Sequence, residues 1–286
     1  MKIKNRTLSF IIVSLVYVIS SALGIAVYTA LNFELWLNLL IADAIATVVV
    51  FIFSVIFKNA SVYDPYWSVQ PIIILISFAL FEQLSAVKIV VLAVVCLWGV
   101  RLTANWAYTF KGLTHQDWRY TMLNEKTGVF YPLINFLGIH MFPTLVVYLC
   151  VLPATTLIVS NATGSPISYL LLCISIIGIV LQGVSDCQMH HFRKNRTTER
   201  FINIGLWKYS RHPNYLGEIL MWWGVGLCSV TALQSQWYLL LGALVNTLMF
   251  LIVSIPMADK RQAKKDGFSE YKKHTHALIP LKLMLK

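Results

Sequence analysis

Long runs of apolar residues, separated by short polar stretches, occupy most of this chain. Most of the runs reach the roughly 20 residues that a helix needs to cross a bilayer. The third run is shorter than the others, so the pattern predicts about eight membrane-spanning helices, within a range of seven to nine. The runs cover residues 8–31, 35–57, 71–81, 86–108, 131–159, 167–185, 215–230 and 237–256.

The composition supports a membrane protein. Of the 286 residues, 58% are hydrophobic and 12% are charged, whereas a soluble domain normally carries about a quarter charged residues. The predicted fold is therefore all-α, a polytopic bundle of membrane helices. No internal repeat or long linker divides the chain, so we expect one membrane domain over residues 1–286, with an N-terminal helix pair at 1–60 and a core at 61–280.

Positive charge indicates how the helices are oriented. If the N-terminus is cytoplasmic and eight helices cross, every Lys and Arg except Lys88 falls on or near the cytoplasmic side. This is the asymmetry that the positive-inside rule describes. Both termini are expected in the cytoplasm, with membrane lipid around the helices. The net charge of +11 then reflects topology, and no nucleic acid is expected as a partner.

The most informative polar segment lies at the start of the run 215–230. Arg211 and His212 precede Pro213, and Asn214 and Glu218 follow at the entrance of the span. Proline suits the first position of a helix, where its missing N–H costs nothing. The free N–H groups of that helix start, together with Arg211, would attract a phosphate. The alternative interpretation is a basic juxtamembrane stop with a proline cap.

A second polar group follows the run 167–185. Asp186 and Arg193 are seven residues apart, so they lie on one face of a helix. In a nucleotide pocket, Asp186 would accept hydrogen bonds while Arg193 and Arg196 neutralised phosphates. The alternative is a solvated basic loop. The seven histidines show no repeated cluster typical of membrane di-iron enzymes, and no metal site is expected.

The third polar group precedes the short run 71–81, where residues 63–67 read Y-D-P-Y-W. Tyr63, Asp64 and Tyr66 would line a pocket that stacks against an apolar substrate and protonates it. The alternative is a turn residue beside aromatic side chains at the membrane interface. Deeper in the second run, Asp43 is a lone acid that needs a partner or a proton.

Several short motifs between about residue 64 and residue 280 carry a family resemblance. They are G-L-W-x-Y at 205–209, S-R-H-P-N-Y-L-G-E at 210–218, D-K-R at 259–261, F-x-E-Y-x8-P at 268–280, D-x-Y-W at 64–67, R-L-x-x-N at 101–105 and D-x-R-Y at 117–120. This set resembles the steroid 5-alpha-reductase C-terminal domain family, and more closely an uncharacterised bacterial branch of that superfamily. The resemblance is strong after Asp186 and thinner before it.

The resemblance implies a membrane-embedded reductase of the bacterial cytoplasmic membrane. NADPH would bind from the cytoplasm to a site within residues 186–280. A lipid-soluble enone of steroid or isoprenoid type would enter from the lipid, and its carbon–carbon double bond would be reduced. The residues implied at the cofactor are Asp186, Arg193, Asn214, Gly217, Glu218 and Tyr271, to which the polar segments add Arg196, Arg211, His212 and Tyr215.

The residues expected at the substrate depart from the family pattern. An ungapped alignment places Tyr63 and Asp64 where the steroid reductases have a glutamine–glutamate pair, and Trp98 where they have a tyrosine. Hydride addition to an enone creates negative charge on oxygen, which a donor must stabilise. A protonated Asp64, or the hydroxyl of Tyr63 or Tyr66, would serve, so these three are the candidate catalytic residues.

Two other functions stay open at this point. Isoprenylcysteine and phospholipid methyltransferases, which bind S-adenosylmethionine, resemble the chain through a related R-H-P-x-Y-x-G segment. The arginines between Arg193 and Arg211 favour a ligand with several phosphates instead. A transporter or membrane scaffold is the second alternative. Transporters usually place polar groups near the middle of the bilayer, and here only Asp43 lies deep in a predicted span.

Overall fold

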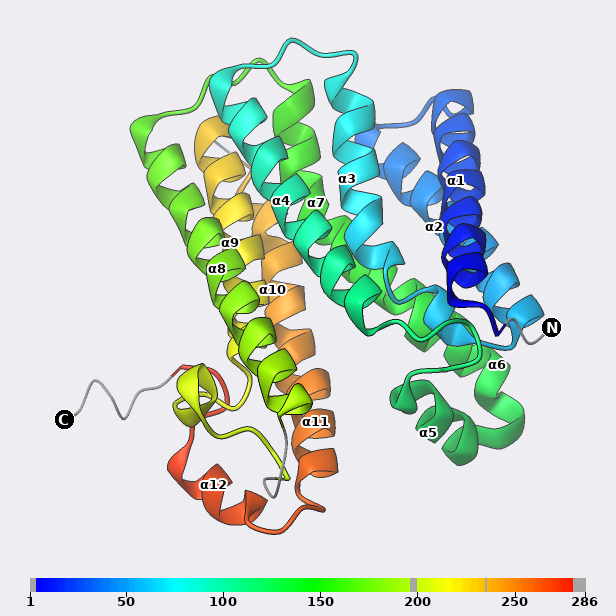
Figure 1. Cartoon of the computed structure of the whole chain (residues 1–286). Helices are drawn as coiled ribbons and strands as arrows, with labels where there is room; N and C mark the ends of the chain where they lie inside the picture. The colour runs from blue at the N-terminus through cyan, green and yellow to red at the C-terminus, as the bar shows by residue number, and fades with distance from the viewer. Residues whose placement is uncertain (1–3, 196–199, 235, 280–286) are drawn as a thin grey trace. The chain divides into compact units, whose positions relative to one another are not determined.

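The structure, a computed structural model, describes residues 4–195, 200–234 and 236–279. In this described part, regular structure is helical apart from one isolated parallel bridge between Ser210 and His276 (Figure 1). The prediction of an all-α fold is confirmed. The longer helices are α1 (Arg6–Ala30), α2 (Leu35–Phe57), α3 (Tyr66–Ala79), α4 (Ala86–Thr109), α7 (Phe142–Val159), α8 (Pro166–Lys194) and α9 (Pro213–Leu233). The shorter ones are α5 (Trp118–Thr127), α6 (Tyr131–Ile134), α10 (Leu241–Met249), α11 (Ile255–Gln262) and α12 (Phe268–His274). Four 3-10 turns are η1 (Ala60–Val62), η2 (Gly128–Phe130), η4 (Gly205–Lys208) and η5 (Trp237–Leu240). Two π-helical turns are η3 (Asn135–Met141) and η6 (Phe250–Ser254).

Seven helical stretches among the described residues are long and apolar enough to cross a membrane. The chain is therefore an integral, multi-pass membrane protein, and the count lies within the predicted range. Helix α3 is not among the seven because its 14 residues fall short of the roughly 20 that a bilayer requires. It begins five residues before the predicted run 71–81, so Pro71 lies inside the helix and not at its start.

The helices form two compact units. The N-terminal unit comprises Met1–Gln83 and Val95–Val159, and the C-terminal unit comprises Leu84–Val94 and Ser160–Lys286, so α4 contributes to both. The expectation of one membrane domain over the whole chain stays a prediction. The candidate catalytic residues lie in the N-terminal unit and the candidate cofactor residues in the C-terminal unit.

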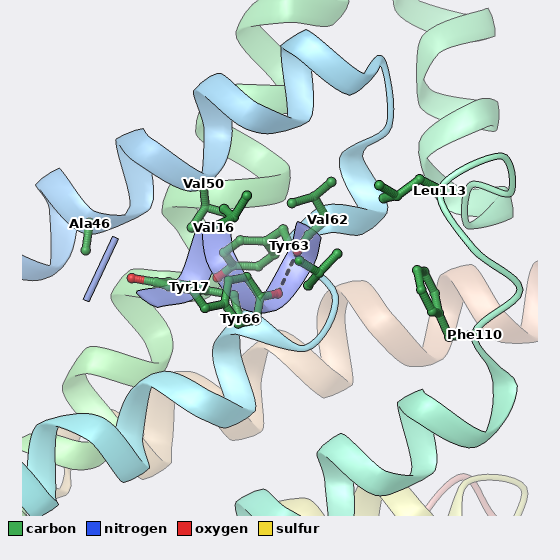
Figure 2. Close-up of a cluster of buried hydrophobic side chains, with 10 residues drawn as sticks. Val16, Tyr17, Ala46, Val50, Val62, Tyr63, Tyr66, Phe110 and Leu113 are labelled. Atoms are coloured by element: carbon green, nitrogen blue, oxygen red, sulfur yellow. Dashed lines mark hydrogen bonds between the residues drawn. The ribbon is translucent and has the colours of Figure 1, made fainter. Parts of the chain in front are cut away.

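The core of the N-terminal unit contains a group of tyrosines (Figure 2). Tyr17 of α1, Tyr63 and Tyr66 pack among valine and alanine side chains, with ring centroids 5.5 Å apart for each neighbouring pair. The Tyr17 hydroxyl donates a hydrogen bond to the Val62 carbonyl at 2.6 Å. The 3-10 turn that precedes α3 is thereby fixed against α1, and Tyr63 is held in the core.

The C-terminal unit is built on close contact between α8 and α9, which lie side by side in Figure 1. Glycines make this approach possible. A Cβ atom on Gly217 would lie 2.5 Å from the Gly178 carbonyl oxygen, and one on Gly224 would lie 2.2 Å from Ser175 Oγ. Small residues at such crossings let membrane helices pack backbone against backbone. Gly217 and Gly224 are seven residues apart and therefore share one face of α9.

Lys88, the basic residue that the charge pattern did not place near the cytoplasm, is buried in the first turn of α4. Its ammonium group donates to the carbonyl of Ser160. Because α4 and the segment before α8 belong to the same unit here, the lysine connects two parts of the chain. The exception in the charge pattern is thus an internal polar contact.

Candidate functional site

Asp259 on α11 is the centre of the polar cluster at the start of α9. Its carboxylate faces Arg211 at 3.0 Å (Nη2–Oδ2) and 3.3 Å (Nε–Oδ1). His212 Nε2 lies 3.0 Å from Asp259 Oδ1, and Lys272 Nζ lies 3.2 Å from Oδ2. The Arg211 and Asp259 side chains are 9% and 7% exposed, so a forked arginine–carboxylate pair is almost fully removed from water. Such pairs fix geometry strongly.

The C-terminal tail docks against the same cluster. The backbone amide of Arg211 donates to the His276 carbonyl at 2.9 Å, and that of His212 donates to the Ala277 carbonyl at 3.1 Å. The Arg211 guanidinium also donates to the Thr275 carbonyl, and the Tyr271 hydroxyl donates to the Trp207 carbonyl. Two stretches of motifs that are separated in the sequence, 205–218 and 259–280, thus meet here, and the contacts between them use Arg211, His212 and Tyr271.

The entry of α9 confirms one prediction and corrects another. Pro213 occupies the first helical position, as expected. The expected free N–H groups of this helix start are partly used, because the amide of Tyr215 donates to the His212 carbonyl at 3.1 Å. The His212 ring stacks on Tyr215 with centroids 5.0 Å apart and an interplanar angle of 6°. An anion therefore finds fewer open backbone donors here than the sequence predicted.

Asn214, in the first turn of α9, differs from its neighbours. Its side-chain oxygen Oδ1 is buried and has no hydrogen-bond partner among the described residues. Gln262 Oε1 and His276 Nε2, in the same unit, are likewise buried and unpartnered within that part of the chain. Buried polar atoms are nearly always hydrogen-bonded, so unpaired ones call for an explanation such as a ligand or an ion.

Gly217 and Glu218 lie in the interface between α8 and α9. Glu218 is 6% exposed, and its two oxygens accept from Gln182 Nε2 at 3.1 Å and Trp222 Nε1 at 2.9 Å. A buried carboxylate needs such donors. The contacts that the structure gives these two residues are with the protein, so direct contact with a cofactor stays a prediction for them.

The remaining candidate cofactor residues lie at the end of α8. Asp186 and Arg193 are both on this helix, two turns apart as expected, with Asp186 half-buried and Arg193 exposed in the last turn. Arg196 lies outside the described residues. Asp259 was not predicted as a site residue, although its D-K-R triplet belongs to the motif set and gave the signal that would have identified it.

The three candidate catalytic residues have three different partners in the N-terminal unit. Tyr63 is 2.9 Å from Thr144 Oγ1 on α7, and the Tyr66 hydroxyl donates to Asp43 Oδ1 on α2 over 3.4 Å. The third, Asp64, accepts from the Tyr120 hydroxyl on α5 at 2.6 Å. The family motifs around Asp64 and Tyr120 therefore meet.

The acid form of Asp64 is favoured by its surroundings. Burial raises the pKa of this carboxyl to about 6, although the neighbouring Arg119 charge and the Tyr120 hydrogen bond oppose the shift. Near neutral pH, a larger fraction of Asp64 is therefore protonated than of an ordinary aspartate, which makes it a better proton donor.

Trp98, which stands at the position of the family's tyrosine, is fully buried and packs against Trp67 with ring centroids 6.1 Å apart.

An apolar pocket of about 190 Å³ lies between α1, α2 and α3, within the N-terminal unit. Of the three candidate catalytic residues, Tyr66 is among those that line it. Asp43 and Gln70 are the other strongly polar groups of the lining. This pocket can accept an apolar molecule that carries a polar group at one end.

Residues 50–275 match a family model described as protein of unknown function DUF1295. The chain belongs to the DUF1295 family. This family includes steroid 5-alpha-reductase-like proteins. Among curated proteins, the chain is similar to one from Schizosaccharomyces pombe, described as uncharacterized protein C594.04c, with 25% identity over 207 residues, 62% of this chain and 60% of that protein. No solved structure matches the chain.

Proposed function

We propose that this member of the DUF1295 family is a membrane-embedded reductase of the bacterial cytoplasmic membrane. Its cofactor is NADPH, and its substrate is a lipid-soluble enone of steroid or isoprenoid type, whose carbon–carbon double bond is reduced. Bound NADPH supplies the hydride for one carbon of the double bond. The chain must then hold the cofactor, shield the reaction from water and deliver a proton to the second carbon.

The unpaired oxygen of Asn214 is the observation that carries this proposal. It is a buried acceptor in the first turn of α9 and has no partner in the described part of the chain. The carboxamide N–H groups of a nicotinamide would satisfy it. Arg193, exposed at the end of α8, is suited to a phosphate because its guanidinium offers forked donors. Asp186, on the same helix, would accept hydrogen bonds from ribose hydroxyls.

In this proposal, Asp64 holds the proton. Its pKa of about 6, raised by burial, keeps a useful fraction protonated near neutral pH. The hydrogen bond from the Tyr120 hydroxyl fixes the carboxyl in one orientation. The hydroxyls of Tyr63 and Tyr66 are weaker acids and would stabilise charge on the substrate oxygen instead.

One observation favours S-adenosylmethionine as the alternative cofactor, and with it a membrane methyltransferase. Arg211 was expected to contact phosphate, yet its guanidinium is bound to Asp259 and to backbone carbonyls. Fewer arginines are then open to a ligand with several phosphates, which weakens the argument from charge. The orphan acceptor of Asn214 would suit the amino group of S-adenosylmethionine equally well.

The test is thermal stabilisation of the purified protein in nanodiscs by NADPH, NADH and S-adenosylmethionine. A ligand that binds the folded state raises Tm once its concentration exceeds its Kd. We expect a shift with NADPH that Asn214→Leu and Arg193→Ala reduce, whereas Asn203→Leu, at an exposed asparagine of the same unit, leaves it unchanged. A shift with S-adenosylmethionine alone would establish the alternative, and no shift with any of the three would refute both.

A further inference from the structure

The carboxyl of Asp64 is held by two hydroxyl groups from different segments. The Tyr120 hydroxyl donates to Asp64 Oδ1 at 2.6 Å, and the Ser61 hydroxyl forms a second hydrogen bond to this carboxyl. Ser61 and Tyr120 are 4% and 8% exposed, whereas Asp64 itself is partly exposed. The two donors therefore lie on the buried side of the carboxyl and leave its other side open.

The local backbone places Ser61 beside Asp64. The Asp64 amide donates to the Ser61 carbonyl at 3.2 Å, three residues back, as in a 3-10 helix. Side chains three residues apart in such a helix lie one above the other. The turn is also capped by Asn59, whose Oδ1 accepts from the Ser61 amide at 2.9 Å. The serine hydroxyl and the carboxyl are thus brought together by the turn itself.

The direction of the Ser61 hydroxyl is set by the start of α5. The backbone amide of Asp117, the residue before α5, donates to Ser61 Oγ at 2.9 Å. Because this amide occupies an acceptor site of the hydroxyl oxygen, the hydroxyl proton is left to point at Asp64. Asp117 and Tyr120 belong to the same D-x-R-Y motif, so one motif orients both donors.

The segment before Asp117 is held against the same turn. The side-chain amide of Asn59 donates to the Leu113 carbonyl at 2.8 Å and to the His115 carbonyl at 3.0 Å. Gln116 Oε1 accepts from the first amide of η1 at 3.0 Å. These three hydrogen bonds keep the Asp117 amide in place, and with it the orientation of the serine hydroxyl.

We propose that Ser61 is a positioning residue for Asp64, and that its hydroxyl, together with that of Tyr120, stabilises the carboxylate left when the proton departs. The inference rests on the proposed role of Asp64 as proton donor. In that step the O–H bond of Asp64 breaks, its proton goes to the second carbon of the double bond, and the electron pair stays on the carboxylate. Hydrogen bonds to an ionised group are about twice as strong as neutral ones, so both contacts strengthen as charge develops.

Burial and the two hydroxyls act in opposite directions on this acid. Burial raises the pKa of Asp64 to about 6, while the hydrogen bonds from Tyr120 and Ser61 lower it. The balance leaves a proton that can be given up and regained near neutral pH. Other titratable groups of this unit that interact electrostatically with Asp64 are Arg119, Asp117, Tyr17 and Tyr63. Replacing Ser61 by alanine leaves all of these groups present.

The test is a pH titration of Asp64 in the full chain in nanodiscs, without NADPH or substrate. The infrared carboxyl band of Asp64 is identified by its absence in Asp64→Asn, and its intensity against pH gives the pKa. Losing a hydrogen bond to the charged form should raise the pKa of Asp64 by about 1 in Ser61→Ala. The protonated fraction at pH 7 should then rise roughly fivefold.

The sign of the change separates positioning from a purely structural role. If Ser61 only held the turn together, its loss would admit water to Asp64, and the pKa would fall towards the roughly 3.9 of a free aspartate. Tyr120→Phe removes the other donor and should also raise the pKa. Ser61→Cys keeps the shape of serine with a much weaker donor, so it gives the same measurement if Ser61→Ala does not fold.

Ser68→Ala is the matched control. Ser68 is 1% exposed, and its hydroxyl hydrogen-bonds to Thr103 Oγ1 at 2.8 Å, so the variant loses a buried hydroxyl contact of the same unit. The pKa of Asp64 should stay within about 0.3 of the wild type. An unchanged or lowered pKa in the Ser61 variants would overturn the proposal. The titration requires no turnover, so this result is separate from any failure of the reductase assignment.

Discussion

Replacing Asp259 by asparagine should release the C-terminal tail from α9. The change keeps the shape of the side chain and removes the charge that holds Arg211, His212 and Lys272. Removing one partner of a buried ion pair costs about 3–5 kcal/mol. Lys272 is 52% exposed and adds little, so the lower value of about 3 kcal/mol is expected.

Hydrogen exchange measures this effect at two amides. The N–H groups of Arg211 and His212 donate to the carbonyls of His276 and Ala277, so they exchange only when the tail opens locally. A loss of about 3 kcal/mol corresponds to exchange roughly 100-fold faster in Asp259→Asn. The exchange of amides in the middle of α9 should stay within about threefold of the wild type, because the helix itself is held by α8.

The control is the same substitution at Asp266, which pairs with Arg200 on the surface. These side chains are 82% and 58% exposed, and exposed pairs contribute about 1 kcal/mol or less. Asp266→Asn should therefore leave the two amides within about fivefold of the wild type. If Asp259→Asn also changes the exchange of the Arg211 and His212 amides by less than about fivefold, the ion pair does not hold the tail and the reasoning is wrong.

Three further predictions concern stability. Because burial raises the pKa of Asp64 to about 6, above the roughly 3.9 of a free aspartate, the folded chain binds more protons between these values. In a pH series of denaturant titrations, the free energy of unfolding of the wild type should fall by on the order of 2 kcal/mol relative to that of Asp64→Asn as pH rises from about 4 to about 6. Gly217→Ala should lower stability by about 1–3 kcal/mol because its Cβ would meet the Gly178 carbonyl. Gly138→Ala, whose Cβ would make an ordinary 3.8 Å contact, is the control in the same thermal unfolding assay, and equal Tm losses would contradict the packing argument. Tyr63→Phe should cost about 1 kcal/mol through the lost hydrogen bond to Thr144, and a variant as stable as the wild type would show that this bond contributes nothing.

The sequence alone predicted the membrane helices and the start of α9. Whether a segment crosses a bilayer depends on its own length and hydrophobicity, and both can be read without knowing the neighbours. Pro213 was likewise placed correctly because the geometry of proline is local. The motifs indicated which segments carry polar side chains, and the two motifs that contain Asp64 and Tyr120 contact each other through a hydrogen bond.

What the polar residues contact was decided by the tertiary structure. The contact of Arg211 with phosphate stays a prediction, and the structure shows that α11 brings Asp259 to this arginine across 48 positions of sequence. The contact of Glu218 with a cofactor also stays a prediction, and its oxygens accept hydrogen bonds from Gln182 and Trp222. The pocket that joins Asp43 and Gln70 had no sequence signature. Hydrogen-bond partners of buried groups depend on which helices pack together, and that arrangement is a property of the whole fold.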